Sequence, residues 1–362
     1  MHSRDRVMTV LNHQEPDRVP LFDSFWVEFA EKWYQEKGLG KEVQIGAYYG
    51  VDIKIAIGDE TPWPSSSETL EETGTYTIVR NNWGQVVKKV PHGWFSEVLE
   101  VPIKEKRDLD PCAFESPYAD FRYENYTKNV QRWKQDFCVF CKTGGPYLRT
   151  SNLRGTEQFL IDIMEDPPFV EAMVERVTDH LIAVGLEELR RGDLYDTGLW
   201  IYDDLAYNDG PMMSPQAYER LFYPAMKRMC EAFRGAGAAK ILLHCDGNLK
   251  PVLDMLIDAG IEGINPVEPK AGLDVVALKE EYEDRLSFVG GMCNAHVLPG
   301  DQEGIKQQLL RNLRAAEGGG LVVGSHSIGL DVPVENYDYM VALLREYGTY
   351  PLRLDREDIN YG

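Results

Sequence analysis

The chain alternates short apolar runs of strand length with longer stretches that carry apolar residues at helical spacing. The clearest run lies in residues 240–247, where three apolar residues precede His244-Cys245-Asp246 and the turn pair Gly247-Asn248. A continuous apolar run that ends in a turn is typical of a buried parallel strand. The same pattern predicts strands at 19–25, 52–57, 137–142, 198–203, 263–267, 286–290 and 321–324.

Helical patterns separate these strands, for example at 156–164, at 167–190 and behind Ser214-Pro215, where Ser is a typical N-cap and Pro a typical first helical residue. Eight strands with intervening helices predict a single (β/α)8 TIM barrel over residues 1–362. An early Gly-x-Gly-x-x-Gly after a strand, which a dinucleotide-binding fold would need, is missing.

Residues 60–135 interrupt the alternation after the second predicted strand. Residues 75–80 and 85–90 flank Asn81-Asn82-Trp83-Gly84, and this pattern predicts a β-hairpin. We therefore expect an N-terminal β-hairpin insertion at the mouth of the barrel.

Composition and charge limit the kinds of molecule that this protein is expected to bind and the compartment in which it is expected to lie. The formal net charge of −21 argues against nucleic acid or an anionic membrane as a partner. The N-terminus has no apolar stretch of the kind found in signal peptides, and no run approaches the length needed to span a bilayer. Six cysteines without a framework spacing favour free thiols, and together these features predict a cytoplasmic protein.

Polar residues follow most of the predicted strands, and in a barrel the carboxyl ends of all strands converge on one face. Two histidines and a carboxylate there would hold a catalytic zinc ion with one position open. Within a strand, alternate residues share a face, so His244 and Asp246 suit a chelating pair, whereas Cys245 points the other way. In chain order these polar residues are Asp23, Asp59, Tyr147, Asp203, Asp204, His244, Asp246, Glu268, Cys293 and His326.

Structural roles remain open for each of these residues. His244 and His326 could be hydrogen-bonded histidines that hold strand ends, and Asp246 before Gly247 could make an Asx turn. Asp203 and Asp204 could cap the loop that follows them. Glu268 could simply pair with Lys270.

The second half of the chain, from about residue 203 to residue 348, resembles the uroporphyrinogen decarboxylase superfamily, which includes corrinoid-dependent methyltransferases. The stretches that carry the resemblance are IYDDLAYNDGPMMSP, LLHCDGNLKPVLDMLIDAGIEGINPVEPKAGLDV, FVGGM and GSHSIGLDVPVEN. The first half matches more loosely, through PDRVP and KTGGPYLRTSNLRG. The resemblance implies a (β/α)8 barrel with its site at the carboxyl ends of the strands.

Within this superfamily the site residues favour the methyltransferase branch over the decarboxylase itself. The decarboxylase holds the carboxylates of its substrate with an Arg-rich N-terminal segment, whereas the segment LFDSFWVEFAEKW here has three acids and no Arg. The methyltransferase branch binds zinc with His-x-Cys on strand five and a Cys before the last helix. The resemblance places His244, Asp246 and His326 at these positions, with Cys245 as a reserve ligand.

The function that this resemblance implies is a zinc-dependent methyltransferase. It would move a methyl group between a small methylated substrate, such as an aryl methyl ether, and a separate corrinoid protein that carries the cobalamin. We expect Asp203 or Asp204 to act in catalysis, and the substrate-binding residues to be Trp26, Tyr147, Tyr202, Tyr207 and Glu268. Dimers are common in the family, so a homodimer is compatible with the resemblance.

Two other function classes remain open from the sequence. One is a metal-free decarboxylase or lyase that acts on a different carboxylate substrate, with the two aspartates as acid and base. The other is a non-catalytic binding barrel.

Overall fold

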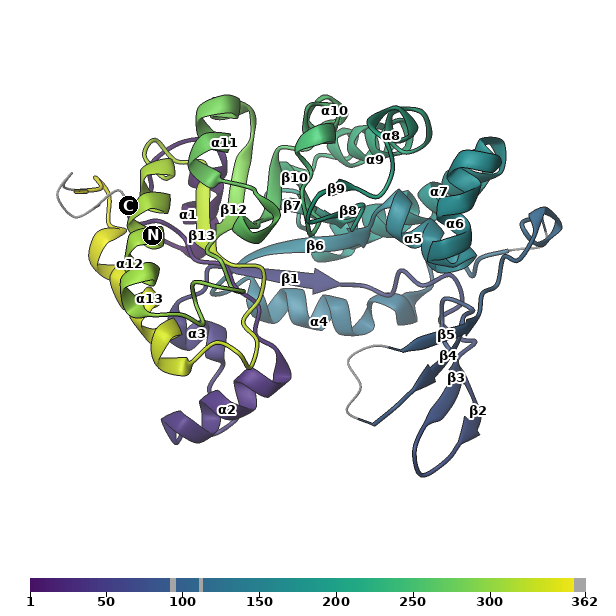
Figure 1. Ribbon diagram of the computed structural model, residues 1–362, viewed down its shortest axis with the longest axis horizontal. Coiled ribbons are helices and arrows are strands. Elements are labelled where there is room, and N and C mark those ends of the chain that lie inside the picture. The colour runs from purple at the N-terminus through teal and green to yellow at the C-terminus, as the bar shows by residue number, and fades with distance from the viewer. Residues whose placement is uncertain (92–95, 111–112, 355–362) are drawn as a thin grey trace.

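Seven parallel strands form a curled central sheet in this computed structural model, which describes residues 1–91, 96–110 and 113–354 (Figure 1). The predicted α/β class with a barrel-like parallel sheet is confirmed. In spatial order the strands are β1 (Ile53–Ile57), β6 (Cys138–Gly144), β7 (Gly198–Tyr202), β10 (Lys240–His244), β11 (Gly263–Val267), β12 (Ser287–Gly291) and β13 (Leu321–Gly324).

An extended segment lies between the two outer strands of this sheet, where the sequence predicts a first strand at 19–25. Leu21 makes an isolated parallel bridge to Val323 of β13, and its carbonyl accepts the N–H of Asp52, the residue before β1. The segment is therefore an extended connection and not a regular strand. Pro20 contributes to this difference because it has no N–H to donate to a ladder.

Helices cover the outer face of the sheet and follow the strands in sequence (Figure 1). The longest, α7, contacts β6 and β7, and its buried side is mostly apolar, with Thr178, His180 and Glu188 as buried polar residues. The predicted cap of α8 is confirmed, because the Ser214 side chain accepts the N–H of Ala217 and Pro215 is the first helical residue. The helices are α1 (Ser3–Leu11), α2 (Val27–Lys37), α3 (Ile45–Tyr49), α4 (Glu124–Trp133), α5 (Pro146–Arg154), α6 (Thr156–Glu165), α7 (Pro167–Gly192), α8 (Pro215–Leu221), α9 (Tyr223–Gly235), α10 (Leu253–Ala259), α11 (Val275–Tyr282), α12 (Gln302–Ala315) and α13 (Val334–Tyr347).

A four-stranded antiparallel sheet stands beyond the carboxyl end of β1 (Figure 1). Its strands are β2 (Glu68–Glu72), β3 (Thr77–Arg80), β4 (Val86–Lys89) and β5 (Glu97–Glu100). β3 and β4 pair across the Asn81–Gly84 turn, at the place where the sequence predicts a hairpin. The sheet contacts α5 through Gln85, which donates to the Asn152 carbonyl. Helix α4, inside the predicted 60–135 insertion, instead packs on β1 and β6 as their connecting helix.

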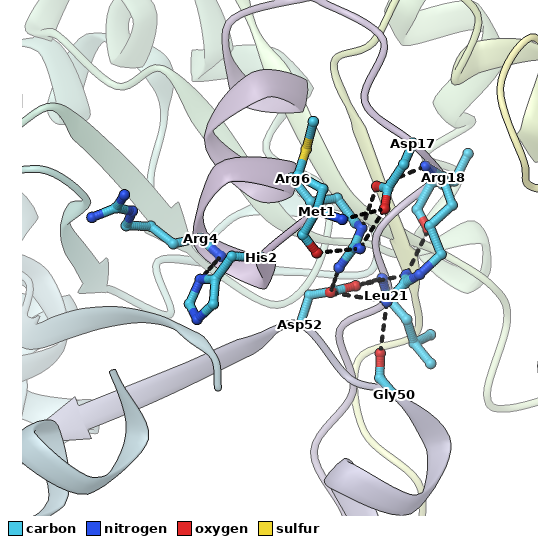
Figure 2. A network of polar contacts seen from close by, with 10 residues as sticks. Met1, His2, Arg4, Arg6, Asp17, Arg18, Leu21, Gly50 and Asp52 are labelled. Atoms are coloured by element: carbon cyan, nitrogen blue, oxygen red, sulfur yellow. Dashed lines mark hydrogen bonds and ion pairs between the residues drawn. The ribbon is translucent and has the colours of Figure 1, made fainter. Parts of the chain in front are cut away.

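A buried ionic network fastens the N-terminal helix to the amino end of β1 (Figure 2). Asp52 is fully buried and accepts hydrogen bonds from Arg6, Arg18 and the N–H of Leu21. Arg6 also donates to both carboxylate oxygens of Asp17, at 2.6 and 2.7 Å. Helix α1, which contacts β1, β6 and β13, is thereby held under the barrel, opposite the carboxyl ends of the strands.

No described helix has the length and apolar content required to cross a bilayer. The five cysteines within the described ranges are all buried with free thiols, and Cys112 lies outside these ranges.

Candidate functional site

Three side chains with metal-binding atoms meet at the carboxyl end of the central sheet. His244 is the last residue of β10, Asp246 follows two positions later, and His326 comes shortly after β13. Asp246 Oδ1 lies 3.5 Å from Nε2 of His244 and 3.3 Å from Nε2 of His326. One ligand atom from each residue lies within 4.8 Å of the others, and no second such group occurs among the described residues.

The neighbours of His244 determine which of its ring nitrogens faces the cluster. His244 Nδ1 lies 2.7 Å from Oδ1 of Asn265, and the amide of Asn265 is oriented by its own donation to the Val289 carbonyl. The Asn265 oxygen therefore accepts the proton on Nδ1, and Nε2 carries a lone pair. This is the tautomer that a histidine ligand needs, held by a hydrogen bond of the usual outer-shell kind.

The donor atoms of this cluster fit a zinc ion. Oδ1 of Asp246 is buried and has no hydrogen-bond partner, although it faces a lone pair of His244. Burial lowers the pKa of His244 and raises the pKa of Asp246, so a charged histidine is disfavoured as the partner of this oxygen. Two imidazoles and one carboxylate form a typical catalytic zinc set with an open fourth position.

Two further residues support the cluster. The Tyr202 ring stacks on the His244 ring with centroids 4.2 Å apart. Glu268 is buried beside His326, with Oε1 3.7 Å from Nδ1 of that histidine. Its other oxygen accepts the N–H of Gly247, and Lys270 lies 3.0 Å from Oε1. Glu268 therefore supports the loops around the cluster, and its pairing with Lys270 matches the structural alternative for this residue.

A cavity of about 620 Å³ opens beside the cluster. Most of its wall is apolar, and such walls with a few convergent polar groups are typical of sites for small organic ligands. Trp26, which donates to the Ser327 hydroxyl, and Tyr202 both lie in this wall, where the sequence predicts them. The lining also includes Phe22, Asp23, Phe25, Ile53, Ile55, Lys142, His244, Asn265 and His326.

Asp203, one of the two predicted catalytic aspartates, lies against the start of α5. Its carboxylate accepts the N–H groups of Tyr147 and Leu148, in the first turn of α5, at 3.3 and 2.7 Å. The side chain is fully buried, and burial raises its pKa to about 7. A Cβ added at Gly145 would overlap the Asp203 side chain, so the two residues are in close contact. Asp203, which follows β7, thus caps α5, the helix that follows the neighbouring strand β6. The sequence alternative also gives Asp203 a capping role, but for the loop that follows it.

The remaining predicted residues are dispersed around the cluster. Asp204 accepts the N–H of Asp246 at 3.3 Å and so borders the candidate metal-binding loop. Tyr147 is buried, and its ring packs against Phe159 and Phe222 in the core, away from the predicted cavity wall. Tyr207 is half exposed on the short β8 (Ala206–Tyr207). None of these residues is part of the described cavity lining.

Cys245, the reserve ligand, points away from the cluster. The alternation of side chains along β10 places it on the opposite face from His244 and Asp246. Its thiol is fully buried and lies 3.2 Å from the carbonyl of Asp246, and burial raises its pKa well above the usual value.

Two polar residues of the site, Asn265 and Lys142, are absent from the sequence predictions. Both lie within strands, whereas the prediction considers only strand ends. Asp23 is among the predicted strand-end residues, without an assigned role. It accepts hydrogen bonds from Ser325, next to His326, and from Tyr337. The sequence signal that could have identified Asn265 and Lys142 is a polar residue inside an otherwise apolar run of strand length.

The comparisons with known proteins agree with this architecture. A model of the uroporphyrinogen decarboxylase (URO-D) family matches residues 90–347, which is more than half of the chain. The chain belongs to the URO-D family. The resemblance inferred from the sequence motifs is thereby confirmed, and the metal-binding cluster lies within the matched region. A search of curated proteins found no match.

Solved structures share the fold of this URO-D family member. A methyltransferase from Methanosarcina mazei superposes with a TM-score of 0.69 at 18% identity, covering 96% of this chain and 99% of its own. A B12-independent methionine synthase from Shewanella sp. W3-18-1 gives a TM-score of 0.44 at 10% identity, with 92% and 93% covered. The first comparison supports the overall fold.

Proposed function

We propose that this protein is a zinc-dependent methyltransferase that transfers a methyl group between a small methylated substrate, such as an aryl methyl ether, and a corrinoid protein. The observation that carries the proposal is the orphaned Asp246 oxygen between two imidazole nitrogens, beside a mostly apolar cavity. The superfamily motifs around these residues and the fold shared with a methyltransferase also support it.

His244, Asp246 and His326 would hold the zinc ion, and Asn265 would orient His244. A zinc ion bound there would act as a Lewis acid toward a substrate heteroatom, which makes that atom a better leaving group. The Tyr202 ring keeps the His244 ring in place, and the aromatic face of Trp26 contributes an apolar wall for the substrate. Asp204, which borders the metal-binding loop, remains the candidate for positioning the substrate.

Access for a partner protein is compatible with the shape of the site. A second hollow of about 680 Å³ also reaches His326, Trp26 and Ser327, and it includes the exposed Leu330. Two openings that share His326 would allow the substrate and the corrinoid to approach the same centre. The corrinoid partner rests on the family resemblance.

The lyase alternative would need Asp203 and Asp204 to exchange protons with a substrate. Asp203 is engaged as a helix cap and is not part of the cavity lining, which weighs against this alternative.

Metal analysis tests the proposal. The protein, purified without a metal-affinity tag, is expected to contain about one zinc per chain. His244→Ala and His326→Ala are expected to lose this zinc, whereas His296→Ala, a change at an exposed histidine outside the cluster, should retain it. Absence of zinc, or zinc that survives both substitutions, would overturn the ligand assignment.

The methyl transfer itself is tested with reduced free cobalamin as the acceptor. The zinc-loaded protein is expected to methylate it from at least one member of a panel of aryl methyl ethers, followed by the absorbance change of the corrinoid. Activity that persists in the zinc-free His244→Ala variant would contradict the proposed role of the metal.

A further inference from the structure

A buried lysine, Lys142, lies in the wall of the cavity, and the Tyr202 ring separates it from His244 of the candidate metal-binding cluster. Lys142 is on β6 and is paired in register with Trp200, so its side chain faces the interior of the barrel. Only 8% of Lys142 is exposed, and this part lines the cavity. Its ammonium lies 5.1 Å from the centroid of the Tyr202 ring, which itself stacks on His244.

The groups around Lys142 carry an excess of positive charge. Glu60 is buried between two cations, with Lys142 Nζ 3.1 Å from its Oε1 and Arg149 paired to the same oxygen. Burial alone would raise the pKa of Glu60, but Lys142 and Arg149 lower it to about 2, so Glu60 is ionised. Burial raises the pKa of the neighbouring Glu188 well above its usual value, which disfavours its charged form. Lys142, Arg149 and Glu60 together carry one net positive charge.

Lys142 is not required to satisfy Glu60. Arg149 pairs with one oxygen of this carboxylate, and the backbone N–H of Gly144 donates to the other. An uncompensated charge in a low-dielectric interior is unfavourable, and an anionic ligand placed against it removes part of that cost. Among the described residues that line the cavity, Asp23 is the only acid, and its hydrogen bonds go to Ser325 and Tyr337.

We propose that Lys142 binds the carboxylate of a small, mostly apolar substrate whose methylated end reaches the His244–Asp246–His326 cluster. This inference rests on the proposed function, because it names the substrate class of the same site. A carboxylate is a monoanion and matches the excess charge at Lys142, while Lys54, a second lysine in the same wall, lies against the Trp133 and Phe137 rings. The apolar walls between Lys142 and the cluster suit an aryl or alkyl body.

Lys142→Met tests the assignment because it removes the charge and keeps an apolar chain of similar length, while Glu60 retains Arg149. Lys142→Arg keeps the charge. Lys227→Met, on the outside of α9 where Lys227 pairs with Asp258, controls for the change in net charge. The probes are benzoate and 4-methoxybenzoate, each compared with its neutral amide, and phenyl phosphate. Binding is measured by titration calorimetry on correctly folded, zinc-loaded and zinc-free protein.

We expect the wild type and Lys227→Met to bind at least one carboxylate about tenfold more tightly than its amide. Lys142→Met should lose this preference with the affinity for the amide unchanged within about twofold, and Lys142→Arg should retain part of it. Equal affinities, no binding by any probe, or a preference that survives in Lys142→Met would overturn the inference. Tighter binding of phenyl phosphate than of benzoate would overturn the assignment to a carboxylate.

The zinc content of the same samples separates this inference from the proposed function. A carboxylate preference in a protein that binds no zinc would support the Lys142 site and contradict the methyltransferase proposal. One zinc per chain without a carboxylate preference would support the zinc site of the proposed function and contradict the Lys142 inference.

Discussion

Oδ1 of Asn265 lies 2.7 Å from Nδ1 of His244, and this contact determines that Nε2 of the histidine faces the metal-binding cluster. The two residues are on adjacent strands, β10 and β11, and are paired in register. The strand pairing itself therefore orients the His244 imidazole, a proposed metal ligand.

Asn265→Leu is expected to weaken zinc binding by about 10- to 100-fold, because the imidazole loses the acceptor that holds its tautomer and orientation. Asn265→Asp keeps an acceptor at the same place and should retain most of the affinity. Competition with a chromophoric chelator measures both constants. An unchanged affinity in Asn265→Leu would show that the contact does not orient the ligand.

Gly145→Ala is expected to lower the free energy of unfolding by about 2 kcal/mol, because its Cβ would overlap the Asp203 side chain that caps α5. Gly74→Ala is the matched control, since nothing lies within 4 Å of a Cβ at that position. Denaturation in urea measures both changes. If the overlap is the cause, Asp203→Gly, which also removes the Cβ that lies 2.2 Å from the added atom, should relieve part of the loss in the double variant.

Arg6→Met is expected to cost about 3 kcal/mol of stability, because it removes one partner of the fully buried Asp52 (Figure 2). Arg4→Met changes an exposed arginine of the same helix, which pairs with Asp5 and Asp196, and should cost less than about 1 kcal/mol. Equal losses of unfolding free energy in the two variants would contradict the importance of the buried pair.

The pH dependence of stability should contain a contribution from Asp23. Burial raises its pKa to about 6, against the hydrogen bonds from Ser325 and Tyr337, whereas the unfolded value is 3.8. The folded state binds the proton more tightly, so this contribution is fully present below pH 3.8 and is lost as the pH rises through about 6. At neutral pH the ionised, buried Asp23 costs about 3 kcal/mol.

Asp23→Asn is isosteric and cannot ionise, so its stability relative to the wild type should increase by about 2 kcal/mol between pH 4 and about pH 7. Urea unfolding in the presence of a chelator measures this difference without interference from bound metal. Parallel stability curves for the two proteins would contradict the raised pKa.

Local patterns predict the regular parts of the fold well. The ends of β11 and β13 are those expected from the sequence, because each is a short apolar run bounded by turn residues. The predicted first strand at 19–25 is an extended segment, since its hydrogen bonds depend on how β13 and the start of β1 approach it. The apolar character of a segment alone does not distinguish a regular strand from an extended connection.

In the candidate site, too, some features follow from the local sequence and others depend on tertiary contacts. Alternation along β10 predicts that His244 and Asp246 share a face and that Cys245 does not, which is the observed arrangement. The position of Asp203 at the end of β7 indicates that its carboxylate makes polar contacts. It does not indicate that these contacts are to the first turn of α5. The choice between a cavity and the first turn of α5 depends on the close packing of Gly145 against Asp203.

The sequence by itself determined the positions of the seven regular strands of the central sheet, the chemistry available at their carboxyl ends and the membership of the URO-D family, because these depend on residues close together in the chain. Only the tertiary structure decided which donors meet. His326 reaches Asp246, and Lys142 reaches Glu60, because the curled sheet brings their strand ends and loops together. The sequence pattern contains no distance between such segments, so pairings of this kind depend on how the sheet curls and how its strands register.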